Sequence, residues 1–585
     1  MSRRRQPANP SARVRTLKND LSKIIHYSQS HSDRTPLQLL IIASYLNRLK
    51  FIETVNNHVC WDETQCKFSP GVLAQLLVLL PFIPSFSKIP LSRIHESYSG
   101  MDLELLVGEP IDPTELNDDQ FARLLDRIYD ADCSRLLLKV ALSVRLAFNL
   151  PDNVVLHSDT TSHVLFGDYI PDDGDIPPIS ITYGYSKQKR NDLKQIQTGM
   201  VTDGDGLIIF SCVLDGNKAD CTYNNEVILK LKEIYGPEFS KYIYVADSKL
   251  LTEPNFNSLT QGDHPIRFIS RIPENFCKKI SEKIRARAFE EDNWVSLGHC
   301  CNYPHAPDSS KYSVFTTDVS VYGRSCYIHL YLTSDGEKKT QKAIEKAEFS
   351  LKESLETLLK KEFSCEPDAV AEMNRFTKEQ SSNLVYAELT VQKVERLKRG
   401  RGRPGKNSKP PVLVVSWRIV CEEIRKNEQK IEEKRRKAST FALLTNISPD
   451  DVSSRDILLH YKGQIKVETN FKLLKEPLLA ATIFLEKPER IMALMSMLYC
   501  SVLMHGILRV ISHIELEKFE TPPKINSNNR PLIRPNSETI VWILSLYTLV
   551  SESEEDGFYV ESVMQDRKKD IPILFQLTRF DLDFI

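Results

Sequence analysis

The stretch QTGMVTDGDGLIIFSCVL, residues 197–214, holds two runs of strand-forming residues around the turn sequence DGDG. Aspartate and glycine in such a turn are typical of a β-hairpin, so the stretch predicts two antiparallel strands. NVVLHSDTT (153–161) and KYIYVAD (241–247) predict two further strands, and TYNNEVILKLKEIY (222–235) predicts a helix between hairpin and last strand. The order strand, hairpin, helix, strand predicts an α/β fold with a mixed sheet and helices on its faces.

The predicted secondary structure changes on both sides of this region of the sequence. Apolar residues recur at helical spacing in TPLQLLIIASYLNRLKFIETV (35–55), which predicts a helical region before the sheet. After these strands, the sequence continues with a long segment that has several strand-like stretches. STFALLTN (439–446) then predicts another strand. We therefore expect a largely β insertion within the sheet domain. The predicted divisions are a basic flexible tail (1–18), a helical N-terminal domain expected to bind DNA (19–150), the core in two parts (151–276 and 439–512), the insertion with a basic segment (277–438) and a C-terminal region (513–585).

Composition narrows the class of protein. The chain has 585 residues, of which 41% are hydrophobic and 26% charged, as in an ordinary globular protein of several domains. Its net charge is −1, so affinity for a polyanion must come from local clusters of positive charge. Twelve scattered cysteines without a CxxC pair favour a reducing compartment over a disulfide framework. The apolar run 491–508 contains serines, a histidine and a glycine, and we expect a buried core helix rather than a membrane span.

Two aspartates follow apolar strand residues. Asp159 in VVLHSDTTS and Asp247 in YIYVADSKLL are both expected where a strand ends, at the rim of the sheet. Sites in folds of this kind tend to lie at that rim, although a single such aspartate is often only a turn former or a helix cap.

The stretch YKGQIKVETNFKLLK (461–475) has the pattern of an amphipathic helix. Tyr461, Glu468 and Lys475 are spaced at steps of seven residues, which places them within about 40° of one another on a helix surface. Gln464 and Lys472 fall on the same stripe. Such a stripe is often only a solvated face, so its function depends on the two aspartates.

Three carboxylates that meet would repel one another unless a divalent cation lay between them. Carboxylate oxygens suit Mg²⁺ or Mn²⁺, and pairs of these ions hold the attacking and leaving oxygens in phosphoryl transfer. Asp159, Asp247 and Glu468 are therefore candidate metal ligands.

These residues resemble those of a known family. Asp159, Asp247 and Glu468, with GYSKQKRNDLKQIQTGMV (184–201) and LDGNKAD (214–220), are similar to the DDE transposases of bacterial and archaeal insertion sequences. The glutamate lies in a pattern that resembles the Tyr-Arg-Glu-Lys signature of one branch, with Gln464 where that branch has arginine. Glu468 lies 221 positions after Asp247, and this distance fits the insertion of this branch.

The resemblance implies an RNase H-like fold in which Asp159, Asp247 and Glu468 are catalytic and bind two Mg²⁺ ions, for which Mn²⁺ can substitute. It implies cut-and-paste transposition: cleavage at transposon ends and strand transfer into target DNA. The partners implied are double-stranded DNA and a second copy of the chain, in a prokaryotic cytoplasm at the nucleoid. The residues expected to contact DNA from the helix are Tyr461, Gln464, Lys472 and Lys475.

A basic segment provides a second candidate contact with DNA. Residues 391–437 hold 16 lysines and arginines against 6 glutamates, a surplus that can drive salt-dependent phosphate binding. Within it, Arg401 and Arg403 belong to an RGRP sequence that resembles an AT-hook core, which can lie in a narrow minor groove. A solvated basic linker explains the composition equally well.

Two other functions remain open on this sequence. Gln464 at the usual arginine position suggests a DNA-binding relative with impaired catalysis. The same sheet and carboxylates would also suit a metal-dependent nuclease that cuts DNA without strand transfer.

Overall fold

The computed structural model describes residues 33–580, except for 84–89, 171–175, 188, 274–277, 302–309, 381–382, 399–411, 476–484, 526–529, 552–557 and 564. The predicted basic tail, Arg401 and Arg403 lie outside the described residues. The chain forms two compact units. Unit 1 comprises residues 1–269 and 460–585, and unit 2 comprises residues 270–459.

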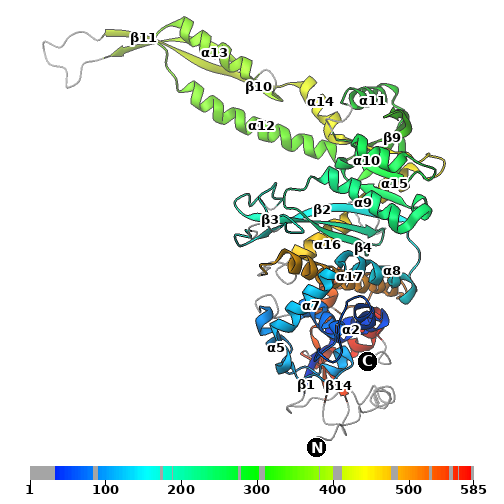
Figure 1. The fold of residues 1–585 in the computed structure, drawn as a ribbon. Helices are drawn as coiled ribbons and strands as arrows, with labels where there is room; N and C mark the ends of the chain where they lie inside the picture. The colour runs from blue at the N-terminus through cyan, green and yellow to red at the C-terminus, as the bar shows by residue number, and fades with distance from the viewer. Residues whose placement is uncertain are drawn as a thin grey trace, which may run out of the picture. The chain divides into compact units, whose positions relative to one another are not determined.

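The sheet of unit 1 contains both parallel and antiparallel neighbours, as predicted. Figure 1 labels three of its strands, β2, β3 and β4. Strand β3 pairs antiparallel with β2 and with β4, and β2 pairs parallel with β5. The hairpin predicted from DGDG joins β3 to β4, where Gly206 takes a positive φ of 84° that favours glycine. The strand order is β4-β3-β2-β5-β6, with β2 (Val155–Leu165), β3 (Lys194–Asp203), β4 (Ile208–Leu214), β5 (Ile243–Ala246) and β6 (Arg267–Arg271).

Helices flank this sheet. The predicted helix before β5 is α9 (Asp220–Tyr235), and α10 (Glu253–Thr260) follows β5. The stretch 461–475 is not one helix as predicted, because α15 (Ser454–Lys462) ends before α16 (Ile465–Lys475) begins. Gly463 lies at the break, where a Cβ atom would come within 2.7 Å of Nε2 of His157. A side chain at this position would therefore require the buried imidazole ring of His157 to shift.

The N-terminal helices share one hydrophobic core with the long helix α17 (Pro488–Leu516) and the C-terminal region. The most apolar 18-residue window of α17 is 89% buried, which confirms the predicted core helix. The elements around it are β1 (Asp33–Pro36), α2 (Leu37–Arg48), α3 (Phe51–Asn56), α4 (Pro70–Leu79), α5 (Ile94–Ser97), α6 (Glu104–Val107), α7 (Asp118–Asp130), α8 (Cys133–Ala147), α18 (Ser537–Leu544), β13 (Tyr547–Ser551), β14 (Phe558–Ser562) and α19 (Ile571–Thr578). Strands β1, β13 and β14 form a small antiparallel sheet.

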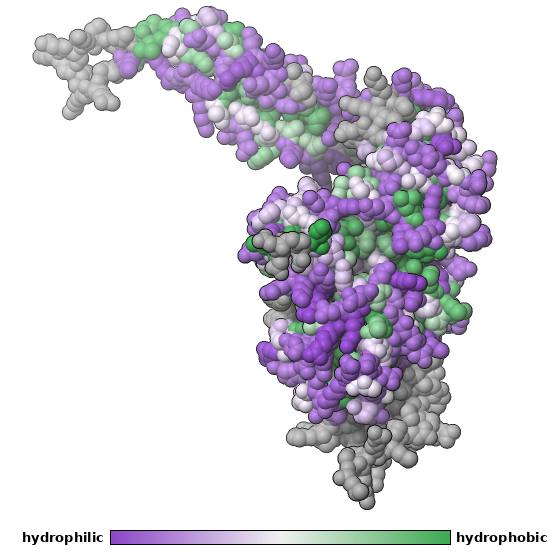
Figure 2. Space-filling model, viewed as in Figure 1, coloured by the Kyte–Doolittle hydropathy of each residue, from purple (hydrophilic) through white to green (hydrophobic). Residues whose placement is uncertain are grey.

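Unit 2 holds helices as well as strands, so the insertion is mixed rather than largely β. Four strands pair in the order β12-β9-β8-β7, and β10 and β11 form a long separate hairpin. The predicted strand 439–446 is β12. The elements are α11 (Lys278–Glu291), β7 (Val295–His299), β8 (Lys311–Val321), β9 (Arg324–Thr333), α12 (Gly336–Leu359), α13 (Glu366–Gln380), β10 (Val385–Lys398), β11 (Val412–Lys426), α14 (Glu428–Ser439) and β12 (Thr440–Thr445). Hydrophilic residues cover most of the face of the protein in Figure 2, with smaller hydrophobic areas between them.

Candidate active site

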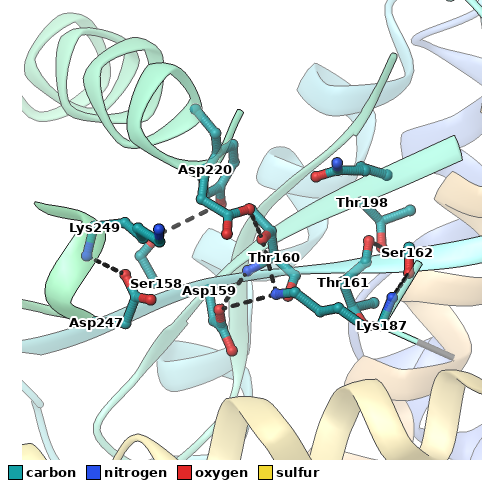
Figure 3. A network of polar contacts seen from close by, with 12 residues as sticks. Ser158, Asp159, Thr160, Thr161, Ser162, Lys187, Thr198, Asp220, Asp247 and Lys249 are labelled. Atoms are coloured by element: carbon teal, nitrogen blue, oxygen red, sulfur yellow. Dashed lines mark hydrogen bonds and ion pairs between the residues drawn. The ribbon is translucent and has the colours of Figure 1, made fainter. Parts of the chain in front are cut away.

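The pairing of β2 with β5 brings Asp159 and Asp247 together. The two strands run parallel, and their register ends with Ser158 opposite Ala246. Asp159 directly follows Ser158, and Asp247 directly follows Ala246. Figure 3 shows the two aspartates side by side. Asp159 lies inside β2 rather than at its end as predicted, because β3 continues to pair with β2 as far as Leu165.

The Asp159 carboxyl group lies in an unusual electrostatic environment for an aspartate. Its side chain is only 24% exposed. Burial raises the pKa of Asp159 to about 6, and the carboxylates of Asp247 and Asp220 act in the same direction. The Lys187 ammonium and a hydrogen bond from the Thr160 N–H, 2.8 Å long, lower the pKa but do not cancel the effect of burial.

Asp247 occupies the start of the short 3₁₀-helix η6 (Ser248–Leu250). Its Oδ1 accepts a hydrogen bond of 2.9 Å from the Lys249 backbone N–H, as expected of a capping residue. Burial raises the pKa of Asp247, and the charge of Asp220 raises it further. Two neighbouring carboxyl groups with raised pKa values mark a place where negative charge is incompletely neutralised.

Lys187 and Asp220 complete the cluster in Figure 3, and neither was predicted from the sequence as a site residue. The Lys187 Nζ donates to the Thr160 carbonyl oxygen at 2.6 Å and to Thr160 Oγ1 at 3.2 Å. It also lies 3.9 Å from Oδ1 of Asp159. Thr160 Oγ1 in turn donates to Oδ1 of Asp220 at 2.6 Å. Both residues lie in the segments 184–201 and 214–220 that carried the family resemblance, but spacing alone assigns them no role.

Helix α16 packs against β2 and β3. Within the described residues, Glu468 does not join Asp159 and Asp247 in a group that could hold a metal ion. Glu468 is exposed on the helix surface. Gln464 is 9% exposed, and its Nε2 donates to the Ser158 carbonyl oxygen at 3.5 Å, so its side chain lies within the protein. Lys475 is half-buried. Burial and the charge of Lys187 lower the pKa of Lys475, and the opposite effect of Asp159 does not cancel this decrease.

The remaining stripe residues have different surroundings. Tyr461 belongs to α15 and is half-buried, whereas Lys472 belongs to α16 and is exposed. The break at Gly463 thus separates Tyr461 from the helix that carries Glu468 and both lysines.

The described part of the chain contains no group of three His, Cys, Asp or Glu side chains close enough to hold a metal ion. The chemistry of Asp159 and Asp247 nevertheless fits Mg²⁺. Both groups offer hard carboxylate oxygens, and burial raises the pKa of each.

Comparison with known families gives two matches. Residues 173–504 match the family model described as a transposase DDE domain. Residues 37–142, which hold most of the N-terminal helices, match a model described as a domain of unknown function (DUF4277).

Comparison with individual proteins gives no match of high similarity. No curated protein matches the chain significantly. Among solved structures, a cryo-EM structure of the piggyBac transposase synaptic complex with hairpin DNA aligns at 8% identity, over 88% of this chain and 82% of that chain. The TM-score is 0.34, which is too low to establish a common fold.

Proposed function

Because this chain belongs to the family of transposases with a DDE domain, we propose that it cuts the ends of a mobile DNA element and joins them to target DNA. The observation that carries the proposal is the register of β2 and β5, which places Asp159 beside Asp247. Both carboxyl groups are largely buried and have raised pKa values. Such a pair at the edge of a strand pairing is suited to hold a divalent ion.

In this proposal Asp159 and Asp247 hold two Mg²⁺ ions, or Mn²⁺ in their place, within an RNase H-like core. Glu468 is the third ligand, supplied by α16, which packs on the same two strands. Bound metal ions would activate a water molecule or a 3′-hydroxyl group for attack on a DNA phosphate. The protein itself fixes the two aspartates through β-sheet pairing and leaves the Glu468 side chain exposed and able to reorient.

The DNA backbone is proposed to lie along α16. Lys475 is half-buried close enough to Asp159 to interact with it electrostatically, so it can hold a phosphate at the site of cleavage. Lys472 and Tyr461 would contact phosphates further along the strand. Gln464 is instead proposed to hold the start of α16 against β2 through Ser158. Arg401 and Arg403 remain candidates for a second contact in the minor groove.

The finer assignments follow from the sequence resemblance. We propose membership of the Tyr-Arg-Glu-Lys branch, an insertion sequence as the element, and cut-and-paste transposition by a homodimer on paired ends. A prokaryotic cytoplasm, at the nucleoid, is the proposed location.

The test is an assay with a labelled element end, Mg²⁺ and a target plasmid. The wild-type protein should give a joined product, and Asp159→Asn should bind the end without cutting it. Asp263→Asn, which changes an exposed aspartate of the same unit, should cut and join normally. Joining by Asp159→Asn at the wild-type rate would refute the assignment of the site.

The burial of Gln464 supports a second candidate function. A neutral side chain directed to Ser158 cannot supply the positive charge that the family signature has at this position. In a relative with impaired catalysis, the same assay would show binding without cutting. In a nuclease, it would show cut ends without a joined product.

A further inference from the structure

Lys187 is built into the aspartate cluster by several contacts. Its backbone N–H donates to Ser162 Oγ at 3.0 Å, which fixes the loop that carries it against β2. Its Nζ reaches both the carbonyl oxygen and the hydroxyl group of Thr160 and lies 3.9 Å from the Asp159 carboxylate (Figure 3). The ammonium group is therefore held at the position where the cluster concentrates negative charge.

The surroundings of Lys187 explain why a cation is needed there. Three carboxylates, of Asp159, Asp220 and Asp247, act on one another electrostatically. Lys187 opposes the rise in the pKa of both Asp159 and Asp247. Through the hydroxyl group of Thr160, which accepts from Lys187 and donates to Asp220, the same ammonium is also linked to the third carboxylate.

The side chain of Lys187 is nevertheless 38% exposed. It can therefore leave the cluster without passing through the protein interior. A lysine ammonium carries one charge on a flexible stem and makes no covalent bond, so a divalent ion with carboxylate ligands can displace it.

We propose that Lys187 is an internal counter-ion that neutralises the aspartate cluster in the metal-free protein and competes with the divalent ion for the same carboxylates. This inference rests on the proposed function, in which Asp159 and Asp247 bind that ion. Lys187 is a positioning residue here: it keeps the three carboxylates together before the metal ion arrives, and it lowers the affinity for that ion.

The test is titration of Mn²⁺ into the full-length protein without DNA, followed by calorimetry or by the electron paramagnetic resonance of free Mn²⁺. Lys187→Gln removes the charge but keeps a polar side chain, and should bind Mn²⁺ about tenfold more tightly, because the lost positive charge lies 3.9 Å from an Asp159 carboxylate oxygen and repels a cation bound by that carboxylate. Lys187→Arg keeps the charge and should stay within about twofold of the wild type. Lys189→Gln, in the same loop, is the matched control and should not change the affinity.

Thermal unfolding gives a second readout that does not depend on DNA cleavage. In EDTA, Lys187→Gln should unfold at a lower temperature than the wild type, and saturating Mn²⁺ should remove the difference. If the variant folds only with Mn²⁺ present, the ion replaces the ammonium as proposed. A variant that fails to fold even with Mn²⁺, or that binds Mn²⁺ no more tightly than the wild type, would overturn the inference.

Asp159→Asn separates this inference from the proposed function. If the wild type and Asp159→Asn bind Mn²⁺ equally, the assignment of the metal site fails, and the counter-ion role fails with it. If Asp159→Asn loses Mn²⁺ binding but Lys187→Gln does not tighten it, only the counter-ion role is refuted.

Discussion

Replacing Asp159 by asparagine should stabilise the metal-free protein at pH 8, although the same change should abolish DNA cleavage. The reason is that the carboxyl group is largely buried next to two other carboxylates. Asparagine has nearly the same shape, and its oxygen can still accept the hydrogen bond from the Thr160 N–H. The substitution therefore removes a destabilising charge and little else.

The size of the effect follows from the pKa. Folding raises the pKa of Asp159 from 3.8 to about 6. Each pKa unit corresponds to about 1.4 kcal/mol, so the ionised carboxylate costs about 3 kcal/mol in the folded state. A raised pKa means that the folded state binds the proton more tightly than the unfolded state. The protonated Asp159 carboxyl group therefore makes its full contribution to the free energy of unfolding below about pH 4. This contribution is lost as the pH rises through 6.

Thermal unfolding in EDTA at pH 4, 5, 6, 7 and 8 measures this difference. For a unit of this size about 1 °C corresponds to 1 kcal/mol, so Asp159→Asn should unfold about 3 °C above the wild type at pH 8. At pH 4 the two midpoints should nearly coincide. Titratable groups that do not interact with Asp159 contribute equally in both proteins and cancel in the comparison. Asp263→Asn is the matched control and should follow the wild type at each pH.

Two outcomes would refute the reasoning. An Asp159→Asn variant that is less stable than the wild type at pH 8 would mean that the ion pair with Lys187 outweighs the cost of burial. A difference in midpoint that is the same at pH 4 and pH 8 would show that Asp159 does not titrate in this range.

Three further predictions test other parts of the structure. Asp247→Ala and Glu468→Ala should each reduce DNA cleavage in a gel assay by at least about 10³-fold, since metal ligands contribute to chemistry more than to binding. The affinity of each variant for the element end should stay within about twofold of the wild type. Cleavage at the wild-type rate by either variant would remove that residue from the site. Gly463→Ala should destabilise the protein by about 2–4 kcal/mol in urea unfolding, because its methyl group would meet the ring of His157 at 2.7 Å; adding His157→Ala should recover part of the loss, and strict additivity would contradict the clash. Deletion of residues 399–405 should weaken DNA binding and flatten its dependence on salt, because phosphate contacts release counter-ions; an unchanged salt slope in a filter-binding or anisotropy titration would leave only a solvated linker.

Local patterns predicted the central elements of the sheet well. The DGDG turn, the strand before Asp247 and the helix that follows the hairpin are all present, because turn chemistry and hydrophobic period act over a few residues. The position of Asp159 inside β2 was not predictable in the same way. It depends on how far β3 continues to pair, which is a tertiary property of residues 194–203.

The break between α15 and α16 shows the same limitation. Residues 461–475 have good helical periodicity, and Gly463 alone is tolerated in a helix at a modest cost. The close approach of the His157 ring, which leaves little room for a side chain at position 463, is a tertiary feature that the local pattern does not reveal. Lys187 and Asp220 were missed for a similar reason, since their meeting at Thr160 depends on how the loop and α9 fold back onto β2.

Glu468 belongs to unit 1, although it lies 221 positions after Asp247 in the sequence. Asn470 on the same helix donates to the Gly206 carbonyl oxygen at 2.9 Å, and Lys466 donates to that of Gly204. Both acceptors belong to the turn between β3 and β4, so α16 is attached to the hairpin that pairs with β2. These contacts that hold α16 beside β2 all lie within unit 1. This explains how a large insertion can interrupt the core between two of the proposed metal ligands and still leave all three in one compact unit.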